Sequence, residues 1–291
     1  MNRNLSQQQQ IERSLRTTYN KTIWKKFITA IQRYELIAEG DNICVCVSGG
    51  KDSMLTAKLM QELHKHSDFP FELHFLVMDP GYNEANRKTI EQNLEILGIP
   101  AIIRDSKIYD SVATMDGSPC YMCARMRRGH LYTFAQELGC NKIALGHHMN
   151  DVIETALMSM FYSSEIGTMM PKLPSTNFPQ MSLIRPLYCV SEQAILDWKE
   201  SNNLEFIRCA CRFTESCIIE PAENGIDEST GSKRADMKLL IAAMKKANPN
   251  IEKSIFASLH NANLNTLLGY KLGSQKHEFA QLYDEINGEK G

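Results

Sequence analysis

Segments with strand character alternate along this chain with segments of helical periodicity, and this alternation restricts the fold more than any other feature. Five strands are predicted, at residues 43–47, 71–78, 101–104, 142–146 and 182–186. Six helices are predicted, at residues 22–34, 54–66, 84–97, 123–138, 151–161 and 192–202. Such alternation predicts an α/β fold, a twisted parallel sheet with helices on both faces. Ligands of these folds bind beyond the carboxyl ends of the strands.

The alternation ends near residue 210, and we expect three regions in the chain. Residues 1–40 form a basic helical segment, residues 41–210 form the α/β domain, and residues 211–291 form an irregular loop followed by a helical tail. Within the tail, helices are predicted at residues 233–246 and 250–268.

The composition is that of a soluble globular protein, because 43% of the 291 residues are apolar and 23% are charged. The first ten residues are polar, and no apolar run reaches the roughly 20 residues that a membrane helix needs. We therefore expect a cytoplasmic protein with no membrane partner. In that reducing compartment the nine cysteines are either small buried side chains or thiolate ligands.

Positive charge gathers at the amino terminus, although the net charge of the whole chain is −2. Residues 1–35 contain seven Lys and Arg residues against two Glu residues. This excess, which includes Lys25 and Lys26, either forms a solvated helix face or binds a polyanionic partner.

The turn after the first predicted strand, S-G-G-K-D-S at residues 48–53, has the chemistry of an anion site. Gly49 and Gly50 allow a sharp turn and a close approach of a ligand to the backbone. The next helix is expected to begin at about Ser53, so its unpaired N–H groups, together with Lys51, suit a phosphate. The spacing is neither G-x-x-x-x-G-K-[ST] nor G-x-G-x-x-G. A generic strand-to-helix turn is the alternative.

Cys120 and Cys123 stand three residues apart at the start of a predicted helix, which places both sulfurs on one side of its first turn. The helix end and the arginines that follow favour the thiolate forms. Cys209 and Cys211 occur together later in the chain. Either one of them completes an iron–sulfur site with one open iron, or both complete a four-cysteine zinc site. Two partly buried thiols are the structural alternative. The remaining cysteines are expected to be structural: Cys44, Cys46, Cys140, Cys189 and Cys217.

Three polar segments are expected to meet at one edge of the sheet because each follows a predicted strand: residues 48–53, Asp79 and residues 146–151. In the third segment Asp151 lies on the first turn of a helix, where the dipole favours a carboxylate. Its functional interpretation is a ligand of Mg²⁺ or a support for the loop, and its structural interpretation is helix capping. Gly146 and His147 would then line a bound nucleotide.

Arg127 and Arg128 belong to a run, C-A-R-M-R-R-G-H, that is too basic for one helical turn unless it faces an anion. Their side chains are expected to meet a nucleotide, RNA phosphates or solvent.

These motifs resemble one family. The S-G-G-K-D-S loop is similar to the signature of the ATP pyrophosphatase (PP-loop) superfamily. The segments EGDNICVCVSGGKDS, CYMCARMRRGHLY, KIALGHHMNDVIET, MFYSSEIGTMMPKL and IRPL look like those of the tRNA 2-thiocytidine synthetases, the TtcA family. The resemblance runs from about residue 13 to residue 268. It implies a fold of the adenine nucleotide alpha hydrolase type and, as cofactors, ATP, Mg²⁺ and a [4Fe–4S] cluster.

The resemblance also assigns roles to residues. Nucleotide binding falls to Ser48, Gly49, Gly50, Lys51, Asp52, Ser53, Met78, Gly146, His147 and Asp151. Catalysis falls to Lys51, Asp52 and Asp151. The cluster ligands are Cys120, Cys123 and Cys209, with Cys211 as the alternative third ligand. RNA binding falls to Arg127, Arg128, Lys25 and Lys26.

The activity that the resemblance implies is an ATP-dependent tRNA sulfurtransferase, which adenylates C2 of an anticodon-loop cytidine and replaces the oxygen by sulfur to give 2-thiocytidine. Its partners would be tRNA and a sulfur donor, either a cysteine desulfurase or sulfide, and the protein would be a homodimer. Two alternatives stay open. One is thiolation of uridine or of a substrate other than tRNA by the same chemistry, and the other is a non-catalytic, zinc-stabilised module that binds nucleotide or RNA.

Two positions depart from the family pattern. The third cysteine segment reads R-C-A-C rather than P-C-x-x-C, which leaves Cys209 and Cys211 both open. Asn150 stands where the family has the first acidic residue of H-H-x-D-D, so Asp151 would carry that role alone.

Overall fold

A computed structural model describes residues 5–113, 119–207, 232–281 and 283 of the protein. The chain divides into two compact units, Met1–Met237 and Lys238–Gly291. The first unit contains the α/β architecture, and the second is a short tail of helix and hairpin.

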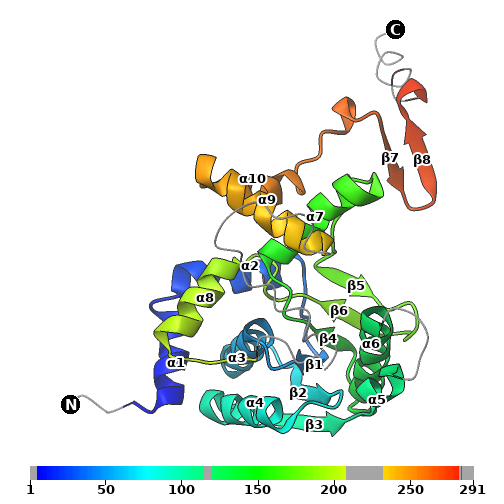
Figure 1. Cartoon of the computed structure of the whole chain (residues 1–291). Helices are drawn as coiled ribbons and strands as arrows, with labels where there is room; N and C mark the ends of the chain where they lie inside the picture. The colour runs from blue at the N-terminus through cyan, green and yellow to red at the C-terminus, as the bar shows by residue number, and fades with distance from the viewer. Residues whose placement is uncertain (1–4, 114–118, 208–231, 282, 284–291) are drawn as a thin grey trace. The chain divides into compact units, whose positions relative to one another are not determined.

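A six-stranded sheet with the order β3-β2-β1-β4-β6-β5 forms the centre of the first unit (Figure 1). Its strands are β1 (Asn42–Val47), β2 (Glu72–Asp79), β3 (Ala101–Asp105), β4 (Lys142–Ala144), β5 (Lys172–Pro174) and β6 (Ser182–Ile184). Neighbouring strands are parallel except β5, which runs antiparallel to β6 at the edge. Val45 pairs with Ala144, and Ala144 pairs in turn with Ile184. The carboxyl ends of β1, β4 and β6 therefore lie side by side.

Helices cover both faces of this sheet. The helices of the first unit are α1 (Gln7–Arg16), η1 (Asn20–Trp24, a π-helix), α2 (Lys25–Arg33), α3 (Lys51–His66), α4 (Glu84–Leu97), α5 (Ile108–Ala113), α6 (Pro119–Glu137), α7 (Met149–Ser163), α8 (Glu192–Ser201) and α9 (Lys233–Ala247), which continues into the second unit. Helix α3 packs on β1 and β2 with α4 and α8 beside it, and α6 packs on β2 and β4 with α5 beside it (Figure 1).

The core on the α6 side is built from small and medium-sized side chains of the central strands. Cys44 and Cys46 of β1 are buried there with Cys140, against Tyr132 and Ala135 of α6. Successive residues of a strand point to opposite faces, and β1 is buried on both of them, which is why it reads as an unbroken apolar run. The structural role predicted for Cys44, Cys46, Cys140 and Cys189 agrees with their burial.

The predicted fold class is confirmed, with differences at several element boundaries. Helix α1 is an addition to the prediction; Ser6 and Gln9 form a capping box at its start, a pattern that is visible in the sequence. The helix predicted at residues 22–34 is a π-helical turn followed by α2. Helix α3 begins at Lys51 rather than at residue 54, because Gly50 is its N-cap residue.

The second unit corrects the prediction of a helix over residues 250–268. Helix α10 (Ile251–Ser258) is followed by a short 3₁₀-helix η2 (Leu264–Thr266) and then by the antiparallel hairpin of β7 (Gly269–Leu272) and β8 (Gln275–Glu278). Gly273 has a φ of +62° in the two-residue connection, and a Gly-Ser pair between two short strands is a hairpin signal.

In the part of the chain that the structure describes, no helix is both long enough and apolar enough to cross a membrane.

A buried ion pair fixes the amino-terminal helix to the α/β core. Lys58 of α3 is fully buried, and its Nζ lies 2.6 Å from Glu12 Oε1 of α1. Lys58 also donates to the carbonyl of Leu97 at the end of α4, and Lys65 Nζ lies 3.0 Å from the same Glu12 oxygen. Burial raises the pKa of Glu12, but the hydrogen bonds from Lys58 and Lys65 outweigh it and lower the pKa to about 2.

We predict that Glu12→Gln destabilises the protein by about 3 kcal/mol at pH 7, because it removes the ion-pair partner of the buried Lys58 ammonium. Since the folded-state pKa of Glu12 is depressed, its contribution is present above the ordinary value of 4.5 and is lost as the pH falls towards about 2. The free energy of unfolding of the variant should therefore fall less steeply than that of the wild type as the pH decreases below about 4.5. Urea unfolding between pH 2 and pH 7 measures both effects. Glu137→Gln, which removes an exposed carboxylate 4.0 Å from Arg104, is the control and should change stability by less than about 1 kcal/mol.

Candidate nucleotide-binding site

A cavity of about 710 Å³ opens at the carboxyl ends of β1, β4 and β6. It brings together many of the residues that the sequence singled out, from four separate segments: Ser48, Gly50, Asp52, Ser53, Met78, Arg127, Arg128, Gly146, His147 and Asp151. The cavity volume is in the range of sites for small molecules and cofactors. The segments converge because parallel strands end at one edge of the sheet.

Several other predicted site residues lie elsewhere. Gly49 and Lys51 do not line this cavity, and Lys25 and Lys26 lie on the exposed face of α2. Cys120 begins the first turn of α6, but its side chain is outside the described part of the structure. Cys209 and Cys211 also lie outside the described residues, so the assignment of the third cluster ligand stays a prediction.

The turn between β1 and α3 is held by its own side chains and leaves the helix terminus open. Ser53 Oγ accepts from the Ser48 N–H at 3.1 Å and donates to the Gly50 carbonyl at 2.9 Å. No side chain caps α3 at Gly50, so its first N–H groups are available to a ligand. Gly49 has a φ of +87°, and a Cβ there would lie 2.6 Å from Ile90, so this glycine is required by the fold of the turn.

Gly146, directly beyond β4, lies against the start of α3. A Cβ at this position would be 2.8 Å from the Asp52 carbonyl carbon and 2.9 Å from the Ser53 nitrogen. These are backbone atoms in a helical turn and cannot move aside cheaply. Because Gly146 has no side chain, the segment that follows β4 and the turn at residues 48–53 can line one cavity.

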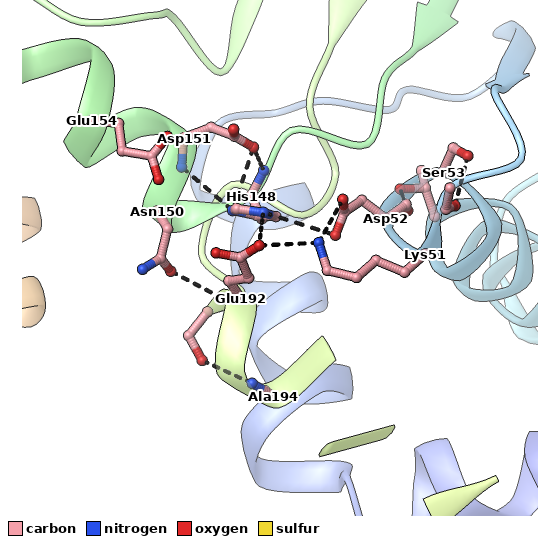
Figure 2. Close-up of polar contacts among 12 residues, drawn as sticks. Lys51, Asp52, Ser53, His148, Asn150, Asp151, Glu154, Glu192 and Ala194 are labelled. Atoms are coloured by element: carbon pink, nitrogen blue, oxygen red, sulfur yellow. Dashed lines mark hydrogen bonds and ion pairs between the residues drawn. The ribbon is translucent and has the colours of Figure 1, made fainter. Parts of the chain in front are cut away.

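Lys51 does not line the cavity, and its side chain points toward the carboxylates of Asp52 and Glu192 (Figure 2). Its Nζ lies 3.0 Å from Asp52 Oδ2 and 3.0 Å from Glu192 Oε1 of α8. Burial lowers the pKa of Lys51, but Asp52 and Glu192 outweigh it and the pKa is raised. Lys51 is thus a cation that holds α3 to α8, and it lines a second, smaller cavity of about 380 Å³ on that side.

His148 joins this cluster to the start of α7 (Figure 2). The residue is buried and caps the helix, since the Asp151 N–H donates to His148 Nδ1 and Asp151 Oδ2 accepts from the His148 N–H. Nδ1 also lies 3.3 Å from Asp151 Oδ2. Nε2 lies 3.8 Å from Asp52 Oδ1 and 3.9 Å from Glu192 Oε1. Asp151 hence caps the helix and also faces the cavity.

Arg234, at the start of α9, reaches the two carboxylates of the α7 amino terminus. Its Nη1 lies 2.9 Å from Asp151 Oδ1 and 3.0 Å from Glu154 Oε2. His147 beside them is neutral at pH 7, because burial, followed by the charge of Arg185, lowers its pKa to about 4. The cavity therefore contains several fixed guanidinium groups and an uncharged imidazole.

Tyr82 connects the turn at residues 48–53 to α6, the helix that carries Cys120 and Cys123. Its hydroxyl donates to the Ser48 carbonyl at 3.4 Å. Burial raises the pKa of Tyr82, and the positive charge of Arg127 on α6 acts in the opposite direction. Asp79, the strand-end candidate nearby, accepts from the Gly81 and Tyr82 N–H groups and pairs with Arg87, so its carboxylate is occupied within its own turn.

Four residues of the site escaped the sequence reasoning: Tyr82, Arg185, Glu192 and Arg234. Arg185 had a usable signal because it lies near the end of the fifth predicted strand, in the I-R-P-L segment. The other three are brought to the site by tertiary packing and carry no local pattern.

Three buried polar atoms of residues that line the cavity are without a hydrogen bond: Asp52 Oδ1, His147 Nδ1 and Arg185 Nε. Together with the uncapped start of α3 and the space that Gly146 leaves, they fit a nucleotide whose phosphates lie on the turn. Asp52 and Asp151 also suit Mg²⁺, which binds through one or two carboxylates plus phosphate oxygens. No group of three or more His, Cys, Asp or Glu that could hold a metal ion occurs within the described residues.

The fold and this turn define a nucleotide-binding protein of the PP-loop class. Residues 9–211 match the PP-loop domain family. The tRNA-cytidine(32) 2-sulfurtransferase of Citrifermentans bemidjiense is 33% identical over 242 residues, covering 82% of this chain and 89% of the relative. That of Geobacter sulfurreducens is 32% identical over 256 residues, covering 86% and 94%. The chain belongs to the PP-loop family and, within it, to the family of these relatives, as the sequence resemblance predicted.

A solved structure has the same fold at lower identity. The U34-tRNA thiolase NcsA from Methanococcus maripaludis, determined with its [4Fe–4S] cluster, superimposes with a TM-score of 0.60 at 19% identity. The match covers 81% of this chain and 77% of that protein, which confirms the fold.

We predict that Gly146→Ala weakens the binding of a nonhydrolysable ATP analogue with Mg²⁺ by about tenfold or more, because the new methyl group separates the β4 connection from α3. Isothermal titration calorimetry measures the affinity. Gly129→Ala is the matched control: a Cβ there meets nothing within 4 Å, and alanine is a better helix former. Equal affinities for the two variants would show that the close contact at Gly146 does not shape the site.

Proposed function

We propose that this protein is an ATP-dependent tRNA sulfurtransferase that converts an anticodon-loop cytidine to 2-thiocytidine. The observation that carries the proposal is that Arg127 and Arg128 of α6 line the same cavity as the PP-loop turn, and that the C-x-x-C segment lies one helical turn before them on α6. Membership of the tRNA-cytidine(32) 2-sulfurtransferase family supports the choice of substrate.

The first step activates the base. The C2 oxygen of the pyrimidine attacks the α-phosphorus of ATP, an O–P bond forms, and pyrophosphate leaves. The N–H groups at the start of α3 would hold the outer phosphates, and Asp52 with Asp151 would hold Mg²⁺. Lys51 would act by fixing Asp52 and α8 rather than by touching the α-phosphate, given where its Nζ lies.

The second step replaces the oxygen. Hydrosulfide attacks C2, the C–O bond breaks, AMP leaves, and the proton of the hydrosulfide goes to solvent. No protein side chain is needed as the nucleophile. The neutral His147 would line the ribose or base without adding charge.

Cys120, Cys123 and one of Cys209 and Cys211 would hold a [4Fe–4S] cluster. The fit rests on the buried Cys123 at the beginning of α6, with Cys120 one helical turn before it. Such a cluster, when bound by three thiolates, supplies an iron with an open position for the sulfide.

The RNA would be held by positively charged side chains that lie outside the nucleotide-binding turn. Arg127 and Arg128 line the cavity, and Lys25 and Lys26 are exposed on α2. The target base must leave its stack to reach the cavity, which is easiest in a single-stranded loop. We further propose a homodimer, a cytoplasmic location and a sulfur supply from a cysteine desulfurase or free sulfide.

The direct test is nucleoside analysis of tRNA from cells that lack the gene. Loss of 2-thiocytidine, restored by the wild-type gene, is the expected result. Loss of a 2-thiouridine in its place would contradict the cytidine assignment, and unchanged thionucleosides would contradict the tRNA sulfurtransferase itself.

We predict that Cys123→Ser abolishes both the brown colour of anaerobically purified protein and its thiolation activity, because a serine hydroxyl is a poor iron ligand. Cys120→Ser and one of Cys209→Ser and Cys211→Ser should behave in the same way. Iron analysis should fall from about four irons per chain to near zero.

The control for this series is Cys140→Ser. The Cys140 thiol donates to Asn42 Oδ1 at 3.3 Å in the core, a bond that a hydroxyl can replace, so iron content and activity should stay. Retention of iron in both Cys209→Ser and Cys211→Ser would overturn the three-cysteine assignment.

A further inference from the structure

We infer that Arg185, together with Arg128, forms a second phosphate-binding subsite in the cavity, at the end of β6 and separate from the PP-loop turn. The inference rests on the proposed function and extends it, because it adds a residue that recognises a second phosphate group.

The position of Arg185 comes from the sheet order. The residue directly follows β6, as Ser48 follows β1 and Leu145 follows β4. Strands β1 and β6 are separated by β4 alone, so their ends are two strand spacings apart, roughly 10 Å. Arg185 thus lines the same cavity as the PP-loop turn, but at its other end.

Arg185 is a buried cation without an ion-pair partner among the described residues. Its side chain is only 8% exposed, and none of the described carboxylates forms an ion pair with it. Its Nη1 donates to the Met170 carbonyl, while its Nε is buried without any hydrogen bond. Burial, and also the nearby charge of Arg128, lowers the pKa of Arg185. A buried cation of this kind is stabilised by an anion.

Among the described residues, each carboxylate of the cavity already has a cation as its ion-pair partner. Asp52 is paired with Lys51, and Asp151, whose charge also acts on Arg185, is paired with Arg234. His147 is neutral at pH 7. Among the described residues, Arg127 and Arg128 also form no ion pair, so three guanidinium groups of one cavity are left for a ligand. Guanidinium groups bind phosphate with a bidentate geometry that lysine lacks.

The phosphate has two possible sources. One is a phosphodiester of the RNA next to the target nucleotide, and the other is the phosphate chain of ATP or its pyrophosphate product. A purely structural role is the competing explanation, since Arg185 also joins the segment before β5 to the sheet through the Met170 and Pro171 carbonyls. That role would need one hydrogen-bond donor but would not need the charge.

The experiment compares Arg185→Gln with the wild-type full-length protein for three probes. These are a synthetic anticodon stem–loop RNA, a nonhydrolysable ATP analogue with Mg²⁺, and inorganic pyrophosphate. Affinities are measured over a range of KCl concentrations. Arg104→Gln is the matched control, because Arg104 is a half-exposed arginine on β3 outside the cavity. Arg185→Lys keeps the charge without the planar fork, and melting temperatures are recorded for all variants.

The expected result for Arg185→Gln is an affinity lower by about tenfold to a hundredfold for the probe that uses the subsite. If that probe is the RNA, the slope of log Kd against log salt should also decrease by about 0.7 to 0.9, the value of one lost phosphate contact. Arg185→Lys should keep the slope and lose only part of the affinity. Loss confined to RNA assigns the subsite to a phosphodiester, and loss confined to the ATP analogue or pyrophosphate assigns it to the nucleotide; both support the subsite.

The inference is overturned if Arg185→Gln binds all three probes as Arg104→Gln does, whether or not its melting temperature is lowered. In that case, with wild-type binding intact, the proposed tRNA sulfurtransferase function is unaffected. If the wild-type protein binds none of the probes, the subsite and the proposed function both fail.

Discussion

The contact between two backbone segments, Gly146 beyond β4 and residues 52–53 at the start of α3, is the constraint on which the site depends. Parallel strands bring the two segments to the same edge of the sheet. Only a residue without a Cβ can approach so closely, because a Cβ at Gly146 would lie less than 3 Å from backbone atoms of residues 52–53. This approach places His147 next to the open terminus of α3. It also sets where α7 begins, because His148, two residues after Gly146, is the N-cap of that helix and forms a capping box with Asp151.

The charges around the PP-loop turn are divided between its two sides. Lys51 faces α8 and is neutralised there by Asp52 and Glu192, so the turn presents mainly backbone N–H groups to the cavity. The opposite wall carries Arg127, Arg128 and Arg185. Backbone donors suit a phosphate that must be held at a fixed position, whereas the arginines suit a longer polyanion whose position can vary. The arrangement separates a wall of backbone donors from a wall of guanidinium groups within one cavity.

The sequence was sufficient for the fold because the central strands β1 and β4 are buried on both faces, and the strands read as short runs between turn signals. It was also sufficient for the strand-end residues, since Ser48, Gly146 and Asp151 are placed by topology alone. The predicted start of α3 at about Ser53 was wrong. Ser53 lies within the first turn of the helix, and its Oγ accepts the Ser48 N–H instead of capping the helix. Glu192 and Arg234 were missed because their partners are decided by the packing of α8 and α9, which has no local pattern.

The departure at Asn150 has a physical explanation in the packing of α7 against α8. The Asn150 Oδ1 atom accepts the backbone N–H of Glu192 at 3.0 Å, at the start of α8. Aspartate can accept the same bond, but it would add a second negative charge beside the Glu192 carboxylate, which already lies 3.0 Å from Lys51 and 3.9 Å from His148 Nε2. Like charges so close destabilise each other in a partly buried site. The amide therefore keeps the connection between the two helices while Glu192 supplies the charge that holds Lys51, and of these two neighbouring positions only Asp151 lines the cavity.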